Sequence, residues 1–140
     1  MIVKSGSAEW TGGLQEGKGS VSTQSGALDA QPYGFATRFE DRPGTNPEEL
    51  LGAAHAACFS MALANLLGGE GITADRIETS SKVSLEKKGE GFEITRAHLV
   101  TRIVADAPEE LLMEVARKAK AGCPVSKLFN AEVTMEATIG

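Results

Sequence analysis

The pattern of apolar and polar residues divides the chain into short strands, one long apolar helix and one amphipathic helix. Residues 50–67 contain no Asp, Glu, Lys or Arg and are mostly apolar, which predicts an enclosed helix. Residues 1–45 are rich in Gly, Ser and Thr, with short alternations typical of strands joined by turns. After the helix, the alternation from Ile77 to Leu85 predicts a strand, and residues 87–91 a turn.

The ends of the remaining elements follow from capping and turn residues. Asn46 is expected to cap the long helix, with Pro47 in its first turn and the glycines at 68–69 ending it. Residues 92–104 are predicted to form a second strand, antiparallel to the first. Apolar and polar residues do not alternate regularly along it, which indicates a bulge or burial on both faces. A second helix is predicted over 107–121, with a capping box from Asp106 and Glu109, then a short helical turn after Pro124.

A final strand over 131–139 completes the order β–β–α–β–β–α–β, which predicts one α+β domain over residues 1–140. Because the long helix is apolar almost all round, it requires cover on every side. A second copy of the chain is the simplest source of that cover, so a homodimer is expected, although the two sheets of one chain are an alternative.

Charge and composition narrow the functional classes. The net charge is −5 and the pI is about 5.1, without a basic cluster, so nucleic acid and anionic membranes are poor partners. A membrane span over 50–67 is rejected because the stretch contains His55, Ser60 and Asn65 and has acidic flanks. Residues 1–10 lack an apolar run of signal-peptide length, so the cytoplasm is the expected compartment.

The two cysteines are the first candidates for chemistry. Cys58 lies in the middle of the apolar helix, where most free cysteines are small buried hydrophobes and where a thiolate needs a cation from elsewhere. Cys123 either ends the second helix, which opposes a thiolate, or caps the short helix opened by Pro124, which favours one. Outside an oxidising compartment, such a pair favours thiol redox chemistry over a structural disulfide.

Other side chains offer alternatives or support. His55 with His98 and Cys123 is a weak zinc set because the ligands are dispersed, and a hydrogen-bonded core or interface histidine is the better interpretation of His55. Arg38 stands in an otherwise uncharged aromatic segment, either exposed on a strand or buried and paired, and Glu48 is its natural partner.

Three segments resemble the OsmC/Ohr family: residues 32–40 (PYGFATRFE), 46–63 (NPEELLGAAHAACFSMAL) and 120–126 (KAGCPVS). The resemblance extends over essentially the whole chain, in the same order. It implies an OsmC-like α+β fold, with antiparallel sheets around the central apolar helix, and an intertwined homodimer.

The resemblance also implies a thiol-dependent hydroperoxide reductase with Cys58 as the reactive cysteine, Cys123 as the second cysteine, and Arg38 and Glu48 beside them. Arg38 would hold Cys58 as a thiolate, oriented by Glu48, and a Cys58–Cys123 disulfide would form and be reduced by an external thiol or dithiol, with a lipoylated protein as one candidate. No cofactor or metal is implied. Ten residues of helix separate Glu48 from Cys58 by roughly 15 Å, so Glu48 cannot touch the thiol of its own helix. Either it acts through the long side chain of Arg38, or the groups meet across the dimer, and both alternatives place the site at an interface.

The apolar surroundings of Cys58 favour organic hydroperoxides over hydrogen peroxide as substrates. Two other classes stay open from the sequence. One is a non-catalytic stress or ligand-binding protein on the same scaffold, with both cysteines passive. The other is a small metal-binding domain.

Overall fold

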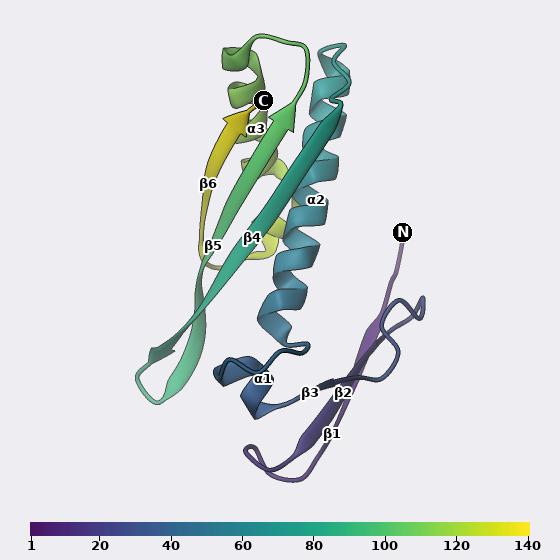
Figure 1. The fold of residues 1–140 in the computed structure, drawn as a ribbon, viewed down its shortest axis with the longest axis vertical. Helices are drawn as coiled ribbons and strands as arrows, with labels where there is room; N and C mark the ends of the chain where they lie inside the picture. The colour runs from purple at the N-terminus through teal and green to yellow at the C-terminus, as the bar shows by residue number, and fades with distance from the viewer. The chain divides into compact units, whose positions relative to one another are not determined.

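The computed structural model describes residues 1–140, which form two compact units, residues 1–50 and 51–140. The predicted α+β class is confirmed (Figure 1). Whether the chain behaves as a single domain stays a prediction.

The first unit is built on a three-stranded antiparallel sheet of β1 (Gly6–Thr11), β2 (Lys18–Thr23) and β3 (Gln31–Tyr33), in that order. The rings of Trp10 and Tyr33 pack with centroids 5.5 Å apart. They leave no room at Gly19, where a Cβ atom would lie 2.4 Å from the Tyr33 ring. Part of the glycine-rich composition of this segment therefore serves ring packing.

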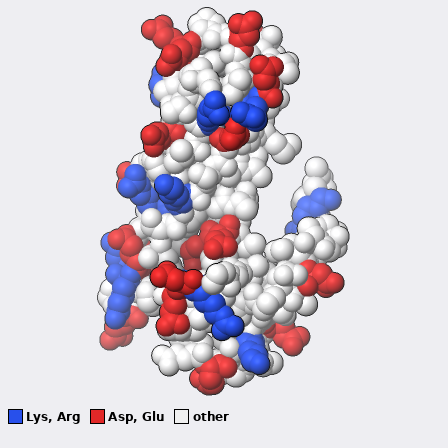
Figure 2. Space-filling view, viewed as in Figure 1, with Lys and Arg blue, Asp and Glu red and all other residues white.

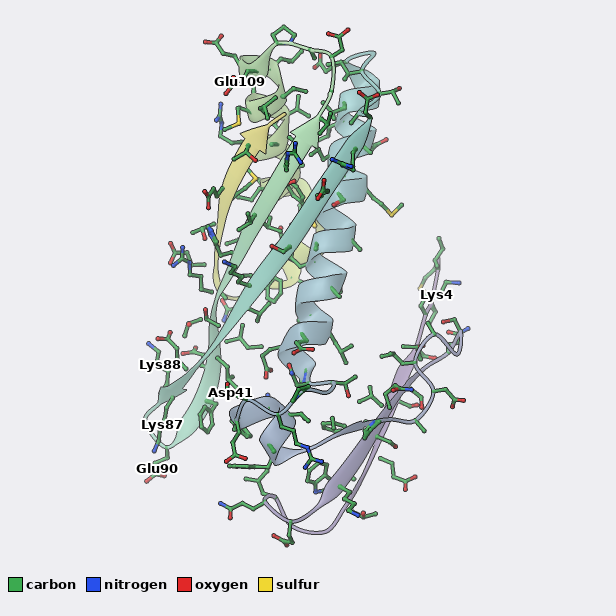
Figure 3. The ribbon with its side chains drawn as sticks, in the orientation of Figure 1. Lys4, Asp41, Lys87, Lys88, Glu90 and Glu109 are labelled. Carbon is green, nitrogen blue, oxygen red and sulfur yellow. The ribbon has the colours of Figure 1, made fainter.

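The second unit contains most of the long helix, from Leu51 onward, and a second sheet. Helix α2 (Pro47–Gly69) begins as predicted, because the Asn46 side chain accepts a hydrogen bond from the Glu49 amide at 2.8 Å. Strands β4 (Arg76–Lys88) and β5 (Gly91–Val104) form a hairpin, with Lys87, Lys88 and Glu90 exposed around its turn (Figure 3). The register shifts between Ser84 and Leu85, which confirms the predicted bulge.

Strand β6 (Glu132–Ile139) pairs in parallel with β5, so this sheet is mixed, with the order β4-β5-β6. The connection between them contains α3 (Glu109–Gly122) and α4 (Pro124–Leu128), and a crossover of this length permits parallel pairing. Helices α2 and α3 both contribute to the core cluster with β5. The buried side chains of that cluster are Phe59, Leu63, Leu67, Leu99, Ile103, Leu112, Val115, Ala116, Ala119 and Cys123.

One local prediction was wrong, and one open alternative was not realised. Arg38 does not lie on a strand, because a short helix, α1 (Phe35–Phe39), occupies the aromatic segment; the Thr37 hydroxyl accepts from the Gly34 amide at 2.9 Å and supports the helical turn. Helix α3 begins at Glu109 with Pro108 at its N-cap and no side-chain cap bond, so the Asp106 capping box does not form. Proline at the cap position replaces it as the start signal.

Helix α2 is buried along one stripe only, rather than on every side as its composition suggests. Gly52, His55, Phe59, Leu63 and Leu67 are buried, at the spacing of one helical face. By length and composition alone, α2 is the one helix that could cross a membrane, with a mean hydropathy of 1.6. Its other faces are apolar and uncovered within one chain.

The close approach of α2 to β4 depends on Gly52, and we expect Gly52→Ala to lower the free energy of unfolding. A Cβ atom there would lie 2.7 Å from the Ser81 carbonyl oxygen, which belongs to the backbone and cannot turn away. Overpacking of this kind costs about 1–3 kcal/mol, against roughly 1 kcal/mol gained in helix propensity. Urea denaturation should therefore show a net loss of unfolding free energy for Gly52→Ala. Gly69→Ala is the control, because Gly69 has open space around it, and it should show no loss.

Candidate active site

The structure brings together the two cysteines, which lie far apart in the sequence. Cys58 projects from the middle of α2 and is partly exposed, whereas Cys123 is fully buried between α3 and α4. Both are free thiols, and they lie close enough for each to change the pKa of the other. This contact is what a dithiol–disulfide pair requires, and neither cysteine's position in its own helix predicts it.

Cys123 is at once the C-cap of α3 and the N-cap of α4. Its own amide donates to the Ala119 carbonyl at 2.9 Å, and its carbonyl accepts from Lys127 at 3.1 Å. The amides of Val125 and Ser126, unpaired at the start of α4, are free to donate to the Cys123 sulfur. The two alternatives left open for Cys123 by the sequence are therefore both realised, and the donors come from α4.

These donors separate the pKa values of the two thiols. Burial raises the pKa of Cys58, the bond with Cys123 raises it further, and the Val125 amide opposes both. Burial also raises the pKa of Cys123, but the hydrogen bonds from Cys58, Ser126 and Val125 outweigh it, so the net pKa is lowered. Within one chain, a thiolate at Cys58 therefore needs a further positive charge.

His55 lies beside this pair, fully buried on the stripe of α2 that faces the sheet. Its Nδ1 is 2.7 Å from the Ser81 hydroxyl and its Nε2 is 2.8 Å from the Ser126 hydroxyl, and Phe129 packs edge-on at 5.1 Å. Burial lowers the pKa of His55, so the imidazole is neutral near pH 7. The interpretation of His55 as a hydrogen-bonded core histidine is confirmed.

Arg38 and Glu48 form the other cluster of candidates, within the first unit. The guanidinium donates from Nε to Oε1 at 3.0 Å and from its second terminal nitrogen to Oε2 at 3.2 Å. The Glu48 side chain is 11% exposed and that of Arg38 is 35% exposed, so one edge of the guanidinium stays accessible. The predicted pairing is confirmed, and its two-point geometry fixes the guanidinium plane.

Asn46 holds this pair in place through both ends of its amide. The side-chain nitrogen donates to the Thr37 carbonyl of α1 at 3.0 Å, and the side-chain oxygen caps α2. The residue is 8% exposed, so both bonds are shielded from water. Asn46 therefore ties the end of α1, which carries Arg38, to the start of α2, which carries Glu48.

The four predicted residues thus form two pairs, Arg38 with Glu48 and Cys58 with Cys123, each described within its own unit. Their catalytic roles stay a prediction. The alternative zinc set is not assembled, because the Nδ1 of His98 contacts Thr134 at 2.6 Å on the opposite face of the sheet from His55. No group of three or more His, Cys, Asp or Glu side chains is arranged to hold a metal.

Sequence reasoning missed the part that Ser126 plays. In the sequence it is only the last residue of the segment 120–126, whereas the structure bonds it to His55 and places it in the helix that Cys123 caps. The spacing was a usable signal, because a residue three positions after a helix cap points its amide back at the cap.

Comparison with known proteins gives a consistent picture. The OsmC-like protein family model matches residues 39–138. Peroxiredoxin OsmC of Escherichia coli is 52% identical over 136 residues, covering 96% of this chain and 95% of that protein. The organic hydroperoxide resistance protein OhrB of Bacillus subtilis is 33% identical over 122 residues, covering 84% of this chain and 86% of that one.

The fold agrees with these relationships. The crystal structure of B. subtilis OhrB superposes with a TM-score of 0.73 at 28% identity, covering 97% of this chain and 98% of that one. With the family model spanning most of the sequence, and a relative that shares half of its residues along nearly the full length, the chain belongs to the OsmC family.

Proposed function

We propose that the protein is a thiol-dependent peroxidase that reduces organic hydroperoxides to alcohols in defence against oxidative or osmotic stress. The observation that carries the proposal is the pair of free, neighbouring thiols formed by Cys58 and Cys123. The names of the relatives, a peroxiredoxin and a hydroperoxide resistance protein, support the same chemistry.

The proposed reaction has three steps. The Cys58 thiolate attacks one peroxide oxygen, the O–O bond breaks, and the leaving alkoxide takes a proton to become the alcohol, which leaves Cys58 as a sulfenic acid. The Cys123 sulfur then displaces hydroxide from that sulfenic acid, which gives the Cys58–Cys123 disulfide and water. An external dithiol, for which a lipoylated protein is one candidate, reduces the disulfide and is itself oxidised.

Arg38 and Glu48 would supply what the cysteine pair lacks. The raised pKa of Cys58 calls for a positive charge, and Arg38 is a guanidinium held rigidly by two bonds, with an accessible edge. In this proposal Arg38 stabilises the Cys58 thiolate and binds the peroxide oxygens, while Glu48 orients it.

We expect Arg38→Lys to lower kcat/KM for the hydroperoxide by at least about tenfold, although the charge is retained. Lysine lacks the planar fork that meets both Glu48 oxygens, so it cannot hold the same orientation. Steady-state kinetics with a dithiol donor measures the effect. Arg42→Lys, a change at an exposed arginine nearby in the sequence, is the control and should leave kcat/KM unaltered. A near-normal rate for Arg38→Lys would reduce Arg38 to a general electrostatic role.

A homodimer is part of the proposal because α2 is uncovered along an apolar face. Small side chains dominate that face and would let a second helix approach closely. Its exposed residues are Ala53, Ala54, Ala57, Met61, Ala64, Asn65 and Gly68. Sedimentation equilibrium should give twice the 14.7 kDa of one chain, and a monomer at micromolar concentration would contradict the assembly.

We place the protein in the cytoplasm, without a membrane or nucleic acid as partner. A dithiol that must return to its reduced form suits a reducing compartment. The polar bonds of His55 to Ser81 on β4 and to Ser126 on α4 suit a helix packed within protein. On the face seen in Figure 2, Lys and Arg are interspersed with Asp and Glu, which does not favour phosphate binding.

Partly exposed Cys58 lies next to the uncovered apolar face of α2, with Met61, 76% exposed, one turn further on. Organic hydroperoxides should therefore be preferred over hydrogen peroxide. Each further methylene of the substrate that is buried should add roughly 0.8 kcal/mol of binding free energy. The test is kcat/KM for hydrogen peroxide, tert-butyl hydroperoxide and cumene hydroperoxide, with dithiothreitol as donor. No consumption of any peroxide would favour the non-catalytic binding protein, whereas equal rates would refute only the substrate preference.

A further inference from the structure

The structure holds a buried hydrogen-bonded chain that the reaction above leaves unused. It runs from Ser81 on β4 through His55 on α2 to Ser126 on α4, and ends beside Cys123, which is the N-cap of that helix three residues earlier. Every member except Ser81 is buried, and His55 and Cys123 are fully so. A polar chain in this position is costly unless each bond is made, and each one is.

The direction of the bonds follows from counting donors. A thiolate at Cys123 can only accept hydrogen bonds, so in that state the hydroxyl of Ser126, the third residue of the helix that Cys123 caps, gives its one proton to the sulfur. It must then accept from His55, which places the proton of the neutral imidazole on Nε2. Nδ1 is left as an acceptor, and the Ser81 hydroxyl donates to it. All three bonds therefore point towards Cys123.

We propose that His55 and Ser126 are positioning residues, which form a relay that orients the sulfur of Cys123 and stabilises its thiolate for attack on the oxidised Cys58. In that step the S–O bond of the Cys58 sulfenic acid breaks and the S–S bond forms. The proton lost by Cys123 ends on the departing hydroxide as water, so no further oxidant or reductant is needed. This step rests on the proposed function, whereas the stabilisation of the thiolate does not.

The surroundings of Cys123 contain few other groups that could stabilise its thiolate, so the relay is a major source of that stabilisation. The titratable groups that face it, Cys58 directly and His55 through Ser126, both come from α2. Its neighbours in the core cluster are apolar side chains from α3, β5 and α2. Besides Cys58 and the amides of α4, the Ser126 hydroxyl is the group that donates to the sulfur, so its removal should be felt directly.

The test compares Ser126→Ala with Ser60→Ala. Ser60 lies on α2 and, like Ser126, uses its hydroxyl in a hydrogen bond, here with Thr79 at 2.9 Å in a separate network, so it is the matched control. Ultraviolet titration of the reduced proteins follows thiolate formation, which belongs to the coupled pair of cysteines. We expect the first ionisation constant to fall at least about tenfold in Ser126→Ala and to stay unchanged in Ser60→Ala.

A single-turnover experiment with one equivalent of cumene hydroperoxide separates the two chemical steps. In Ser126→Ala, sulfenic acid formation at Cys58 should not slow, whereas disulfide formation should slow about tenfold. Ser126→Thr, which keeps the hydroxyl, should restore it. His55→Gln keeps a donor towards Ser126, so its rate of disulfide formation should be nearer to the wild-type rate than that of His55→Leu.

The relay would be overturned if Ser126→Ala changed neither the first ionisation constant nor the rate of disulfide formation. It would also be overturned if Ser60→Ala lowered both as much as Ser126→Ala does. If the wild-type protein consumes no hydroperoxide, the proposed function fails, but the titration still decides whether Ser126 stabilises a thiolate. If His55→Leu does not fold, the decision passes to Ser126→Ala, which removes a single oxygen atom.

Discussion

Replacing Cys58 with serine should abolish hydroperoxide reduction, with kcat/KM lowered at least about a thousandfold, as expected when a catalytic nucleophile is lost. A serine hydroxyl is not ionised near neutral pH and is a far weaker nucleophile towards peroxide oxygen than a thiolate. The fold should be retained because serine is close in size to cysteine and is able to donate to Cys123 as the thiol does.

The measurement is peroxide consumption with dithiothreitol, accompanied by a thermal unfolding curve. Ser60→Ala, two residues away on the same helix, serves as the control and should keep full activity. Substantial turnover by Cys58→Ser would exclude Cys58 as the reactive residue. Because the lowered pKa belongs to Cys123, attention would then turn to that thiol as the primary nucleophile.

Replacing Cys123 with serine should have a different outcome, in which the protein reacts once and then stalls. The sulfenic acid at Cys58 would form but would lose the sulfur that converts it to a disulfide. Mass spectrometry after one equivalent of hydroperoxide should find one added oxygen at Cys58, and excess peroxide should drive it to sulfinic acid. Sustained turnover at the wild-type rate with a dithiol would mean that Cys123 is dispensable.

The same variant is informative about the contact between the two thiols. Cys123 is an acceptor for the Cys58 hydrogen bond, and that bond raises the pKa of Cys58. A serine at position 123 is a less polarisable neighbour and cannot become a thiolate. Removal of the competing thiolate should therefore allow Cys58 to ionise at lower pH, so the first, single oxidation should be no slower than in wild type.

Much of the fold could be predicted from the sequence because its signals are local. Asn46 and Pro47 mark the start of α2, and the alternation of β4 and the bulge in the hairpin follow from side-chain order. The local signals failed at α1, where the Thr37 hydroxyl and the neighbouring Asn46 support a helical turn that composition does not indicate. They failed again at Pro108, which replaced the predicted capping box.

The sequence by itself determined which residues are candidates for the chemistry: the two cysteines, the Arg38–Glu48 pair and the apolar helix needing cover are all recognisable from residue type and motif. Only the tertiary structure decided how they act on one another. In the structure, Cys58 lies beside Cys123, and Cys123 is the N-cap of α4. His55 is hydrogen-bonded to Ser126 of the same short helix. The physical reason is that thiol pKa values and buried hydrogen bonds depend on groups distant in sequence, whose distances are fixed by packing rather than by local pattern.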